Sequence, residues 1–313
     1  MKPAGAAPTQ AIGLIGCGRW GRLILRDLLR LGARVSVVAA GENARHAESA
    51  GAAQVVGDIH KLPASLDGFV VATPTSTHAD VIESLLPRGA PIFCEKPLCH
   101  DAARARRLAA AGRGRVFVMD KWRYHRGVLA LAEIARSGEL GPVVGLNTTR
   151  IGWGHDYGDV DCVWTLLPHD LSIALEIFGR LPTPRHAVAD RAAGGIMGVV
   201  AVSTFDGGPW LLTEVSARST ERRRDVTLIC RDGSAALTDA YADHLVLTDA
   251  PPANGPAPEP RVTRRKIAAD MPLLAELAAF LDHLKGGPAP KSPLEDAAAV
   301  VETIAAIRSL AGI

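Results

Sequence analysis

Three glycines near the start of the chain have the spacing of a phosphate-binding turn. Gly16, Gly18 and Gly21 fit the pattern G-x-G-x-x-G and directly follow the apolar run AIGLI at residues 11–15. Leucine and isoleucine recur at helical spacing after them, so the turn joins a buried strand to a helix. There the first glycine permits a tight turn, the second lets a pyrophosphate approach the backbone, and the third lets helix and strand pack closely. The pattern predicts a dinucleotide site.

A lysine at the end of a later strand is the main candidate for catalysis. Lys96 lies in the tripeptide Glu95-Lys96-Pro97, directly after an apolar strand predicted over residues 91–94. The carboxyl ends of parallel strands border the ligand crevice, where an ammonium group can bond a substrate hydroxyl and stabilise the alkoxide formed as hydride leaves. Glu95 is expected either to hold Lys96 by charge pairing or to take part directly. The alternative, a surface lysine in a turn, is weakened by Glu95, Pro97 and the glycine pattern.

The second predicted strand ends without the acidic residue that usually binds the ribose. NAD-binding proteins carry Asp or Glu about 20 residues after the glycines, where it bonds the ribose 2′-hydroxyl. Here the strand ends at Ala40 and Glu42 follows slightly late, whereas Arg19 and Arg45 could face a 2′-phosphate or could simply be solvated. We therefore expect NADP or NAD as the cofactor, with a preference for NADP. Arg19, Trp20 and Arg45 are assigned to its site.

Alternating strands and helices must position these residues in the first part of the chain. Helices are expected after the glycine turn and over residues 44–50, 78–86 and 101–111. Strands are expected over residues 11–15, 34–40, 54–56, 68–72, 91–94 and 115–119. Such alternation with short connections predicts a doubly wound parallel sheet, the Rossmann arrangement, in an NAD(P)-binding domain over residues 1–120.

The remainder, residues 121–313, reads as a second, α+β domain for substrate binding and oligomerisation. Gly-Gly, Asp-Gly and proline separate successive strands, which predicts an open, mostly antiparallel sheet. Strands are expected over residues 143–153, 196–205, 210–217, 225–230, 235–239 and 244–248. Helices are expected over residues 170–178, 273–285 and 294–310, and an exposed loop over 250–260. The last helix is a candidate to pack back on the first domain.

Composition narrows the function classes. The net charge of the 313-residue chain is +2, and no long basic run suggests a nucleic-acid partner. Its five cysteines are scattered and odd in number, which favours reduced thiols in a cytoplasmic protein. Residues 1–10 lack the apolar core of a signal peptide, and no run is long enough to span a membrane. We expect a small-molecule enzyme with no membrane or nucleic-acid partner.

Further motifs make the chain similar to a known family. In order along the chain they are Ala72-Thr73-Pro74 with His78, then Glu95-Lys96-Pro97, Arg123-Tyr124, Leu167-Pro168-His169-Asp170, and PLLAELAAFL at 272–281. Their order and spacing resemble the Gfo/Idh/MocA family (glucose–fructose oxidoreductase, inositol dehydrogenase, rhizopine catabolism) over nearly the whole chain. The resemblance implies a Rossmann domain and a second domain whose open sheet often forms the oligomer interface. It also implies NAD(P)-dependent oxidation or reduction of a carbinol in a sugar, cyclitol or nucleotide sugar.

The resemblance implies roles for residues of the predicted Rossmann domain. The loop with Thr73 and Pro74 would contact the nicotinamide half of the cofactor, and His78 begins the next helix; for Thr73, plain turn chemistry is an equal alternative. The Lys96–Pro97 peptide bond would be cis, as is common in the family. Thr73, Pro74 and His78, together with Glu95 and Lys96, complete the assigned cofactor site.

The resemblance places the second catalytic group at His169. The family pattern resembles D-x-G-x-H, in which Asp and His lie four residues apart on one helical face. Here Thr165 occupies the aspartate position, and threonine cannot serve as a carboxylate base, so any proton transfer falls to His169 or Lys96. The alternative for His169 is a structural role beside a helix N-terminus, with Asp170 in the first turn.

We assign Tyr124, Trp153, Thr165 and Asp170 to the substrate side. Packing between domains is an alternative for Tyr124. Trp153 begins a polar, aromatic loop whose aromatic faces and carboxylates suit sugar C–H faces and hydroxyls. His155, Asp156, Asp159 and Asp161 of this loop match no metal-ligand spacing, so we expect no metal.

Two short basic runs, residues 222–224 and 264–266, read as solvated strand faces. A contact with the phosphate of a nucleotide sugar is the minor alternative for these arginines and lysine.

The sequence therefore predicts an NAD(P)-dependent dehydrogenase or reductase acting on CH–OH groups, active as a homodimer or homotetramer. Two alternatives stay open. One is an NAD-dependent glycosidase of the same family, which would release a free sugar without net cofactor reduction. The other is a dinucleotide-binding sensor without catalysis, which Thr165 favours and Glu95-Lys96-Pro97 opposes.

Overall fold

The chain forms two compact units in a computed structural model. The structure describes residues 9–154, 159–192, 195–251, 259–268 and 271–313. The first unit comprises Met1–Lys121 and Leu273–Ala298, and the second comprises Trp122–Pro272 and Ala299–Ile313. Each unit has its own sheet, and each is described below by itself.

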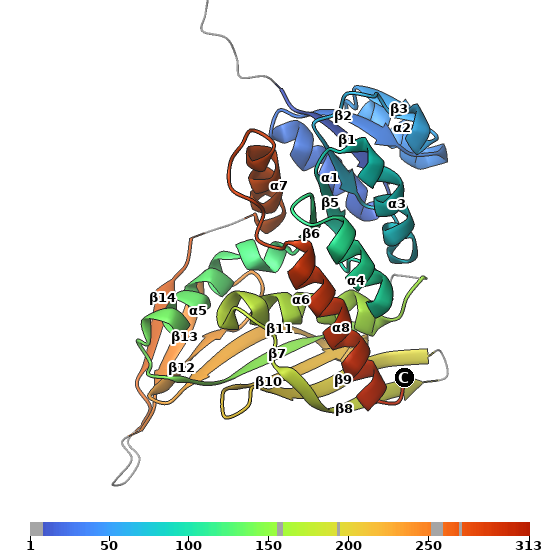
Figure 1. Ribbon diagram of the computed structural model, residues 1–313. Coiled ribbons are helices and arrows are strands. Elements are labelled where there is room, and N and C mark those ends of the chain that lie inside the picture. Colours follow the sequence, from blue (N-terminus) through green and yellow to red (C-terminus); the bar gives the residue numbers. More distant parts are fainter. Residues whose placement is uncertain (1–8, 155–158, 193–194, 252–258, 269–270) are drawn as a thin grey trace, which may run out of the picture. The chain divides into compact units, whose positions relative to one another are not determined.

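The first unit is built on a six-stranded parallel sheet (Figure 1). Its strand order is β3-β2-β1-β4-β5-β6, so the strand order reverses between β1 and β4. The strands are β1 (Ala11–Ile15), β2 (Arg34–Val38), β3 (Gln54–Val56), β4 (Gly68–Val71), β5 (Ile92–Glu95) and β6 (Val116–Met119). This doubly wound arrangement confirms the predicted Rossmann sheet, and ligands of such sheets bind at the carboxyl ends of the strands where the order reverses.

Helices cover both faces of this sheet. They are α1 (Arg19–Arg30), α2 (Gly41–Ser49), α3 (His78–Leu85), α4 (Ala102–Ala111) and α7 (Pro272–His283). Side chains alternate between the faces of a strand, and Phe93 of β5 stacks on Phe280 of α7 with ring centres 5.0 Å apart. The fully buried Ile24 and Leu28 of α1 join the same apolar cluster. Helices α1 and α7 therefore share one face.

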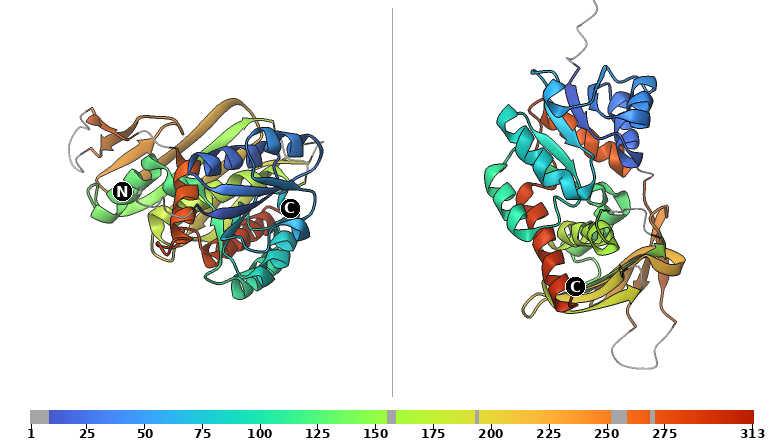
Figure 2. Two further views of the ribbon diagram at one scale, coloured as in Figure 1. Left: turned by 90° about the horizontal axis from the view of Figure 1, so that it is seen from above. Right: turned by 90° about the vertical axis from the view of Figure 1, so that its right-hand side faces the viewer.

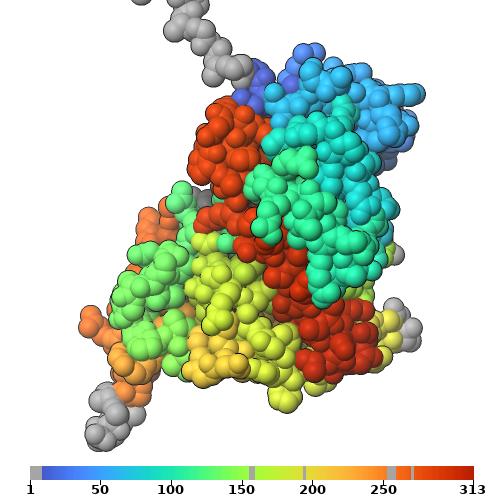
Figure 3. Space-filling view, viewed as in Figure 1, coloured from blue at the N-terminus to red at the C-terminus, as the bar shows by residue number. Residues whose placement is uncertain are grey.

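Helices α3 and α4 run side by side on the surface of the first unit (Figure 3). Arg104 of α4 lies between two carboxylates of α3, pairing with Asp80 and, at 2.6 Å, with Glu83. Asp101 caps α4 by accepting a hydrogen bond from the Arg104 backbone N–H. Because both pairs are largely solvent-exposed, they fix the register of the two helices more than they stabilise the fold.

The second unit is built on an eight-stranded sheet in the order β14-β13-β12-β11-β7-β10-β9-β8. All neighbours are antiparallel except β7 and β10, which are parallel. Its strands are β7 (Val143–Trp153), β8 (Thr183–Ala192), β9 (Gly195–Thr204), β10 (Trp210–Ser216), β11 (Arg218–Cys230), β12 (Gly233–Leu237), β13 (His244–Asp249) and β14 (Val262–Lys266). The mostly antiparallel sheet confirms the predicted fold class.

Helices α5 (Arg126–Ser137) and α6 (Cys162–Phe178) pack side by side on one face of this sheet (Figures 1 and 2). The other face exposes valines: Val188 of β8 and Val200 of β9 are cross-strand neighbours that are 72% and 43% exposed. Helix α8 (Leu294–Leu310) completes the chain. None of the helices in the described part of the chain has the length and apolar character needed to cross a membrane.

Several elements of the second unit depart from the sequence prediction. Helix α5 was not predicted, although Val128, Leu131 and Ile134 recur at helical spacing and are buried. Strands β8 and β14 were also not predicted: they are the two edge strands of the sheet, and their polar, charged sequences lack an apolar alternation. The predicted start of a helix at Asp170 is wrong, because α6 begins eight residues earlier, at Cys162.

Candidate active site

The glycine turn leaves room for a ligand at one of its three glycines. Gly16 has a φ of +93°, and a Cβ there would meet the Ala72 carbonyl oxygen at 2.6 Å. A Cβ on Gly21 would clash with the Gly16 carbonyl oxygen, whereas a Cβ on Gly18 would meet nothing within 4 Å. Gly16 and Gly21 are thus needed for packing, and the open side at Gly18 fits the approach of a pyrophosphate. Helix α1 begins there without a side-chain cap, so its N-terminus can receive phosphate oxygens.

Glu95 connects the glycine turn to the predicted catalytic lysine. Trp20 of α1 donates a hydrogen bond from Nε1 to Glu95 Oε1, and the Lys96 backbone N–H donates to Glu95 Oε2 at 3.1 Å. The Lys121 ammonium lies 4.5 Å from the centre of the Trp20 ring. Both carboxylate oxygens of this buried residue therefore have protein partners. Their geometry fixes the Glu95 carboxylate between Trp20 and the backbone of Lys96.

The charge of Glu95 depends on its burial and on neighbouring lysines. Burial raises its pKa to about 6, against the opposing effect of the Lys96 and Lys121 ammonium groups and the Trp20 hydrogen bond. The carboxylate is therefore ionised at neutral pH and becomes protonated as the pH falls below about 6. The Lys96–Pro97 peptide bond is cis, as the family resemblance implied.

His78 connects the loops that follow β4 and β5. Its Nδ1 lies 2.8 Å from the Pro97 carbonyl oxygen and its Nε2 lies 2.9 Å from the Thr73 carbonyl oxygen. The Thr73 hydroxyl is bonded to the Thr77 hydroxyl at 2.8 Å, and the neighbouring Pro74 is exposed. His78 is 1% exposed. These contacts place Thr73, Pro74 and His78 at the strand ends together with Lys96, with the histidine ring turned toward backbone carbonyls.

Arg22 of α1 contacts the first turn of α2, which follows the end of β2. Arg22 Nη2 lies 3.0 Å from Glu42 Oε1 and 3.0 Å from Asn43 Oδ1, both in the first turn of α2. Glu42 and Arg45 are exposed, as is Arg19 in the glycine turn. Ala39 and Ala40 present no polar side chain at the strand end. A ribose or its 2′-phosphate bound there would thus lie beside Ala39 and Ala40, with the exposed Arg19 and Arg45 as the nearby charged side chains.

A buried carboxyl group in α7, which interacts electrostatically with Glu95, was not assigned from the sequence. Glu276 is 1% exposed, and its Oε2 has no hydrogen-bond partner among the described residues. It lies one helical turn before Phe280, which stacks on Phe93 of β5, and it is electrostatically coupled to Glu95, Asp120 and Lys121. Burial, and next the charges of Glu95 and Asp120, raise the pKa of Glu276 well above its ordinary value. It is accordingly a neutral carboxyl group over a wider pH range than usual.

We expect Glu276→Gln to raise the free energy of unfolding at pH 8 and to leave it nearly unchanged near pH 4.5. A carboxyl whose pKa is raised in the folded state loses stability as the pH climbs past its unfolded value, and glutamine cannot ionise. The gain should exceed about 1 kcal/mol, because one pKa unit corresponds to about 1.4 kcal/mol. Urea unfolding at both pH values measures it. Glu48→Gln, on the exposed face of α2, is the control; equal behaviour of both variants would contradict the prediction.

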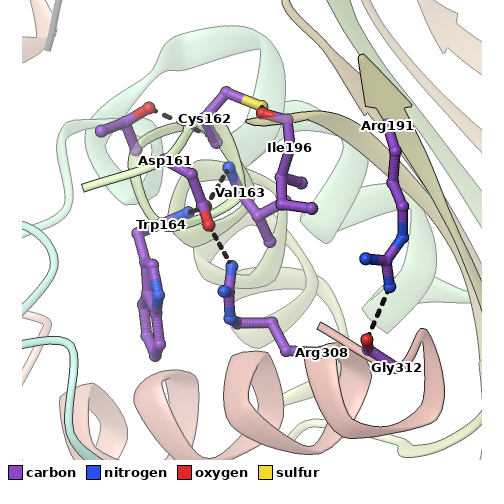
Figure 4. Close-up of polar contacts among 9 residues, drawn as sticks. Asp161, Cys162, Val163, Trp164, Arg191, Ile196, Arg308 and Gly312 are labelled. Carbon is purple, nitrogen blue, oxygen red and sulfur yellow. Dashed lines mark hydrogen bonds and ion pairs between the residues drawn. The ribbon is translucent and has the colours of Figure 1, made fainter. Parts of the chain in front are cut away.

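Helix α6 of the second unit begins after Asp161 and not, as predicted, at Asp170. Asp161 caps the helix by accepting hydrogen bonds from the backbone N–H groups of Val163 and Trp164, at 3.1 and 3.4 Å (Figure 4). Its other oxygen pairs with Arg308 of α8 at 2.6 Å. Pro168 lies inside the helix, where its missing N–H leaves one helical hydrogen bond unmade. Because α6 begins at Cys162 and continues through Pro168, Thr165 and His169 lie on one helix, about a turn apart.

His169 lies beside a buried tryptophan. Its ring centre is 6.5 Å from that of Trp122 in an edge-to-face arrangement, and Trp122 also stacks on His125 at 5.0 Å. Thr165 is buried, and its hydroxyl donates to the Cys162 carbonyl oxygen at 3.2 Å. The suggested setting of His169 beside a helix N-terminus is wrong, because the residue is in the middle of α6.

Asp170 faces away from solvent into an ion pair. It is 0% exposed, and its two oxygens accept from Arg150 Nε at 2.9 Å and Nη2 at 3.2 Å. The Arg150 guanidinium also lies 4.6 Å from the centre of the Trp122 ring. Burial raises the pKa of Asp170, and the Arg150 charge opposes that rise. The contacts described here make Asp170 an anchor of α6 on β7; its assignment to the substrate side stays a prediction.

The other predicted substrate residues lie at the ends of elements of the second unit. Tyr124 is half-buried in the 3₁₀ turn Lys121–Tyr124, two residues after Trp122. Trp153 ends β7 and is 74% exposed. Within the described part of the chain, no group of three His, Cys, Asp or Glu side chains could hold a metal ion. His155 and Asp156, which were weighed as ligands, lie outside the described residues.

Part of the first unit matches a known protein family. Residues 11–119 match the GFO_IDH_MocA family, described as an oxidoreductase family with an NAD-binding Rossmann fold. The chain is 36% identical over 145 residues to inositol 2-dehydrogenase from Cereibacter sphaeroides, a match that covers 43% of each chain. The match thus spans less than half the length of that curated relative.

Solved structures share the whole fold at low identity. UDP-N-acetylglucosamine 3-dehydrogenase GnnA from Acidithiobacillus ferrooxidans aligns over 97% of this chain and 98% of its own, with a TM-score of 0.83 and 22% identity. An oxidoreductase from Agrobacterium radiobacter, in complex with NAD+, L-tartaric acid and magnesium, aligns over 97% of each chain with a TM-score of 0.84 and 17% identity. The TM-scores show a common fold, and at identities this low the comparison shows the fold alone.

Proposed function

We propose that this protein is an NAD(P)-dependent dehydrogenase or reductase of the Gfo/Idh/MocA family, whose model residues 11–119 match. Its reaction moves a hydride to or from a secondary alcohol or ketone of a sugar, cyclitol or nucleotide sugar. The observation that carries the proposal is the bridge made by Glu95: one carboxylate oxygen bonds Trp20 of the open glycine turn and the other bonds the backbone of Lys96. A cofactor at the turn and a substrate at the lysine would then share one rigid frame.

Each residue has a proposed task. Gly16, Gly18 and Gly21, with the N-terminus of α1, hold the pyrophosphate, and the nicotinamide ring, when bound, supplies or accepts the hydride. Lys96 donates a hydrogen bond to the reacting oxygen and stabilises its negative charge. His169 takes the proton from that oxygen or returns it. Thr165 orients the histidine or bonds the substrate, with Tyr124 and Trp153 lining the substrate side of the second unit.

A substrate screen tests the function. Reduction of NADP+ or NAD+ is followed at 340 nm with a panel of sugars, cyclitols and nucleotide sugars, and the corresponding ketones are tested with NADPH or NADH. Turnover of at least one alcohol or ketone is the expected result. Tight cofactor binding without turnover of any member would favour a dinucleotide-binding sensor instead, for which Thr165 in place of a carboxylate is the supporting observation. The five free, buried cysteines support a cytoplasmic protein.

NADP(H) should bind more tightly than NAD(H), because the tip of β2 carries Ala39 and Ala40 without an acidic side chain and Arg45 is exposed nearby. Arg45→Ala should weaken NADPH binding by about 1.5–3 kcal/mol, the range of a charge-assisted hydrogen bond, and leave NADH binding unchanged. Calorimetric titration of both cofactors measures the difference. Arg34→Ala, at the amino end of β2, is the control. A clear preference of the wild-type protein for NADH would show that Glu42 or the backbone binds the ribose.

A dimer or tetramer should be present at micromolar concentration, because one face of the second sheet exposes apolar side chains that monomers rarely leave in water. Val200→Glu, beside Val188 on that face, should shift the molar mass measured by light scattering toward the monomer. Asp206→Lys, in the exposed turn after β9, is the control. A strictly monomeric wild-type protein at high concentration would refute the proposed interface.

A further inference from the structure

Arg222 and Arg224 of β11 lie on the face of the second sheet that carries α6, beside the ion pair between Arg150 and Asp170. Arg224 of β11 is directly opposite Arg150 of β7 in the antiparallel ladder. Side chains at opposed positions of antiparallel strands project from the same face. Arg150 reaches α6 through its ion pair with Asp170, so Arg224 also projects from the face that carries α6. Arg222, two residues earlier, adjoins Gly152, the residue before Trp153.

Among the described residues, the positive charges on this face outnumber the carboxylates that pair with them. Arg150 donates hydrogen bonds from Nε and Nη2 to the two carboxylate oxygens of Asp170, at 2.9 and 3.2 Å. Within the parts of the chain that the structure describes, neither Arg222 nor Arg224 has a carboxylate at ion-pair distance. Arg223, which projects from the opposite face, does: it pairs with Asp225 at 3.1 Å. The alternation along β11 therefore separates Arg223, which has an ion-pair partner, from two arginines that have none among the described residues.

Arg224 has no ion-pair partner among the described residues, and this makes its burial unfavourable. The side chain is half-buried, and burial lowers its pKa, as do the charges of Arg150 and Arg222. Asp239 and Tyr241 are the described groups that oppose this effect. A buried or half-buried charge that lacks a counter-ion costs free energy, and an anionic ligand would remove that cost.

We propose that Arg224 and Arg222 bind the carboxylate or phosphate of an anionic substrate. The substrate class is then a sugar-like alcohol that carries a negative group, such as a sugar acid or a sugar phosphate, and this inference rests on the proposed dehydrogenase function. Arg224 is connected to the predicted catalytic His169 through its neighbour Arg150, whose guanidinium packs on Trp122, and the Trp122 ring meets His169 edge to face. A planar guanidinium binds carboxylate and phosphate oxygens with two parallel hydrogen bonds.

Binding by matched ligand pairs tests the proposal. Calorimetry with NADPH-loaded protein compares gluconate with sorbitol, and glucose 6-phosphate with glucose, in wild type and in Arg224→Ala, Arg224→Gln and Arg223→Ala. One anion should bind at least about 10-fold more tightly than its neutral partner, and its identity distinguishes carboxylate from phosphate. Both Arg224 variants should lose roughly 10- to 100-fold of that affinity. Arg223→Ala should lose none.

The melting temperature of the ligand-free protein separates binding from packing. Arg224→Gln should melt at or above the wild-type temperature, since it removes an uncompensated charge; a lower value would indicate a structural role and overturn the proposal. Equal binding of charged and neutral partners, no binding of either anion at millimolar concentration, or equal losses in the Arg223 and Arg224 variants would overturn it too. Turnover of a neutral alcohol, undiminished in Arg224→Ala, would leave the dehydrogenase function standing without this subsite. Anion binding that depends on Arg224, without any hydride transfer, would leave this subsite standing and contradict the dehydrogenase function.

Discussion

Lys96→Met should retain cofactor binding and lose roughly 10²–10³ of the turnover rate. Methionine keeps most of the length of the side chain but removes the charge and the hydrogen-bond donors. Loss of one such electrostatic contact to a developing oxyanion typically costs that factor. Cofactor binding should persist because the contacts that order the glycine turn are made by Glu95, which bonds Trp20 and the Lys96 backbone. Calorimetry with NADPH and steady-state rates on the first substrate identified measure the two effects separately.

The control for this substitution is Lys61→Met, on the exposed 3₁₀ turn Ile59–Lys61 of the same unit. It should leave both binding and turnover unchanged. Full activity of Lys96→Met on an identified substrate would contradict the proposed mechanism. Joint loss of cofactor binding and activity would mean that Lys96 holds the cofactor and has no separate role at the reacting oxygen.

The first half of the fold was predictable because its signals are local. Glycines at fixed spacing, apolar strands such as 68–71 and the helix cap at Asp101 each determine their own neighbourhood, and a parallel sheet follows from their alternation. The family motifs then located Thr73 and Lys96 after strand ends and His78 at the start of the next helix. What the sequence could not show is that Glu95 contacts Trp20, since 75 residues separate them and only folding brings them together.

The second half was less predictable because its decisive contacts are non-local. The sequence predicts helix α6 only from Asp170, whereas its actual cap, Asp161, lies in the stretch predicted to be a polar, aromatic loop. Edge strand β8 shows no apolar alternation because much of it is exposed. The partner of Arg150 could not be read from sequence, although a charged residue inside an apolar helical stretch such as PLLAELAAFL indicates a buried carboxyl group.

His169→Asn should lower the turnover rate by roughly 10²–10⁴, the usual contribution of a general acid or base. Asparagine retains a polar group on α6 but cannot exchange a proton near neutral pH. The contacts that anchor the helix beside this residue, Asp170 with Arg150 and the Asp161 cap, are untouched by the substitution, so the fold should persist. His60→Asn, on the exposed 3₁₀ turn Ile59–Lys61, should leave the rate unchanged.

The pH profile of alcohol oxidation distinguishes His169 from Glu95. In the wild-type protein the rate should fall with decreasing pH across the range where histidines titrate, because a protonated imidazole cannot accept the substrate proton. In His169→Asn the remaining rate should be flat above about pH 6 and fall only below it, where Glu95, with a pKa of about 6, becomes protonated and no longer offsets the neighbouring lysines. Glu95→Gln should show the complementary profile, keeping the histidine limb. If His169→Asn leaves both the rate and the profile unchanged, proton transfer falls to Lys96 or to water.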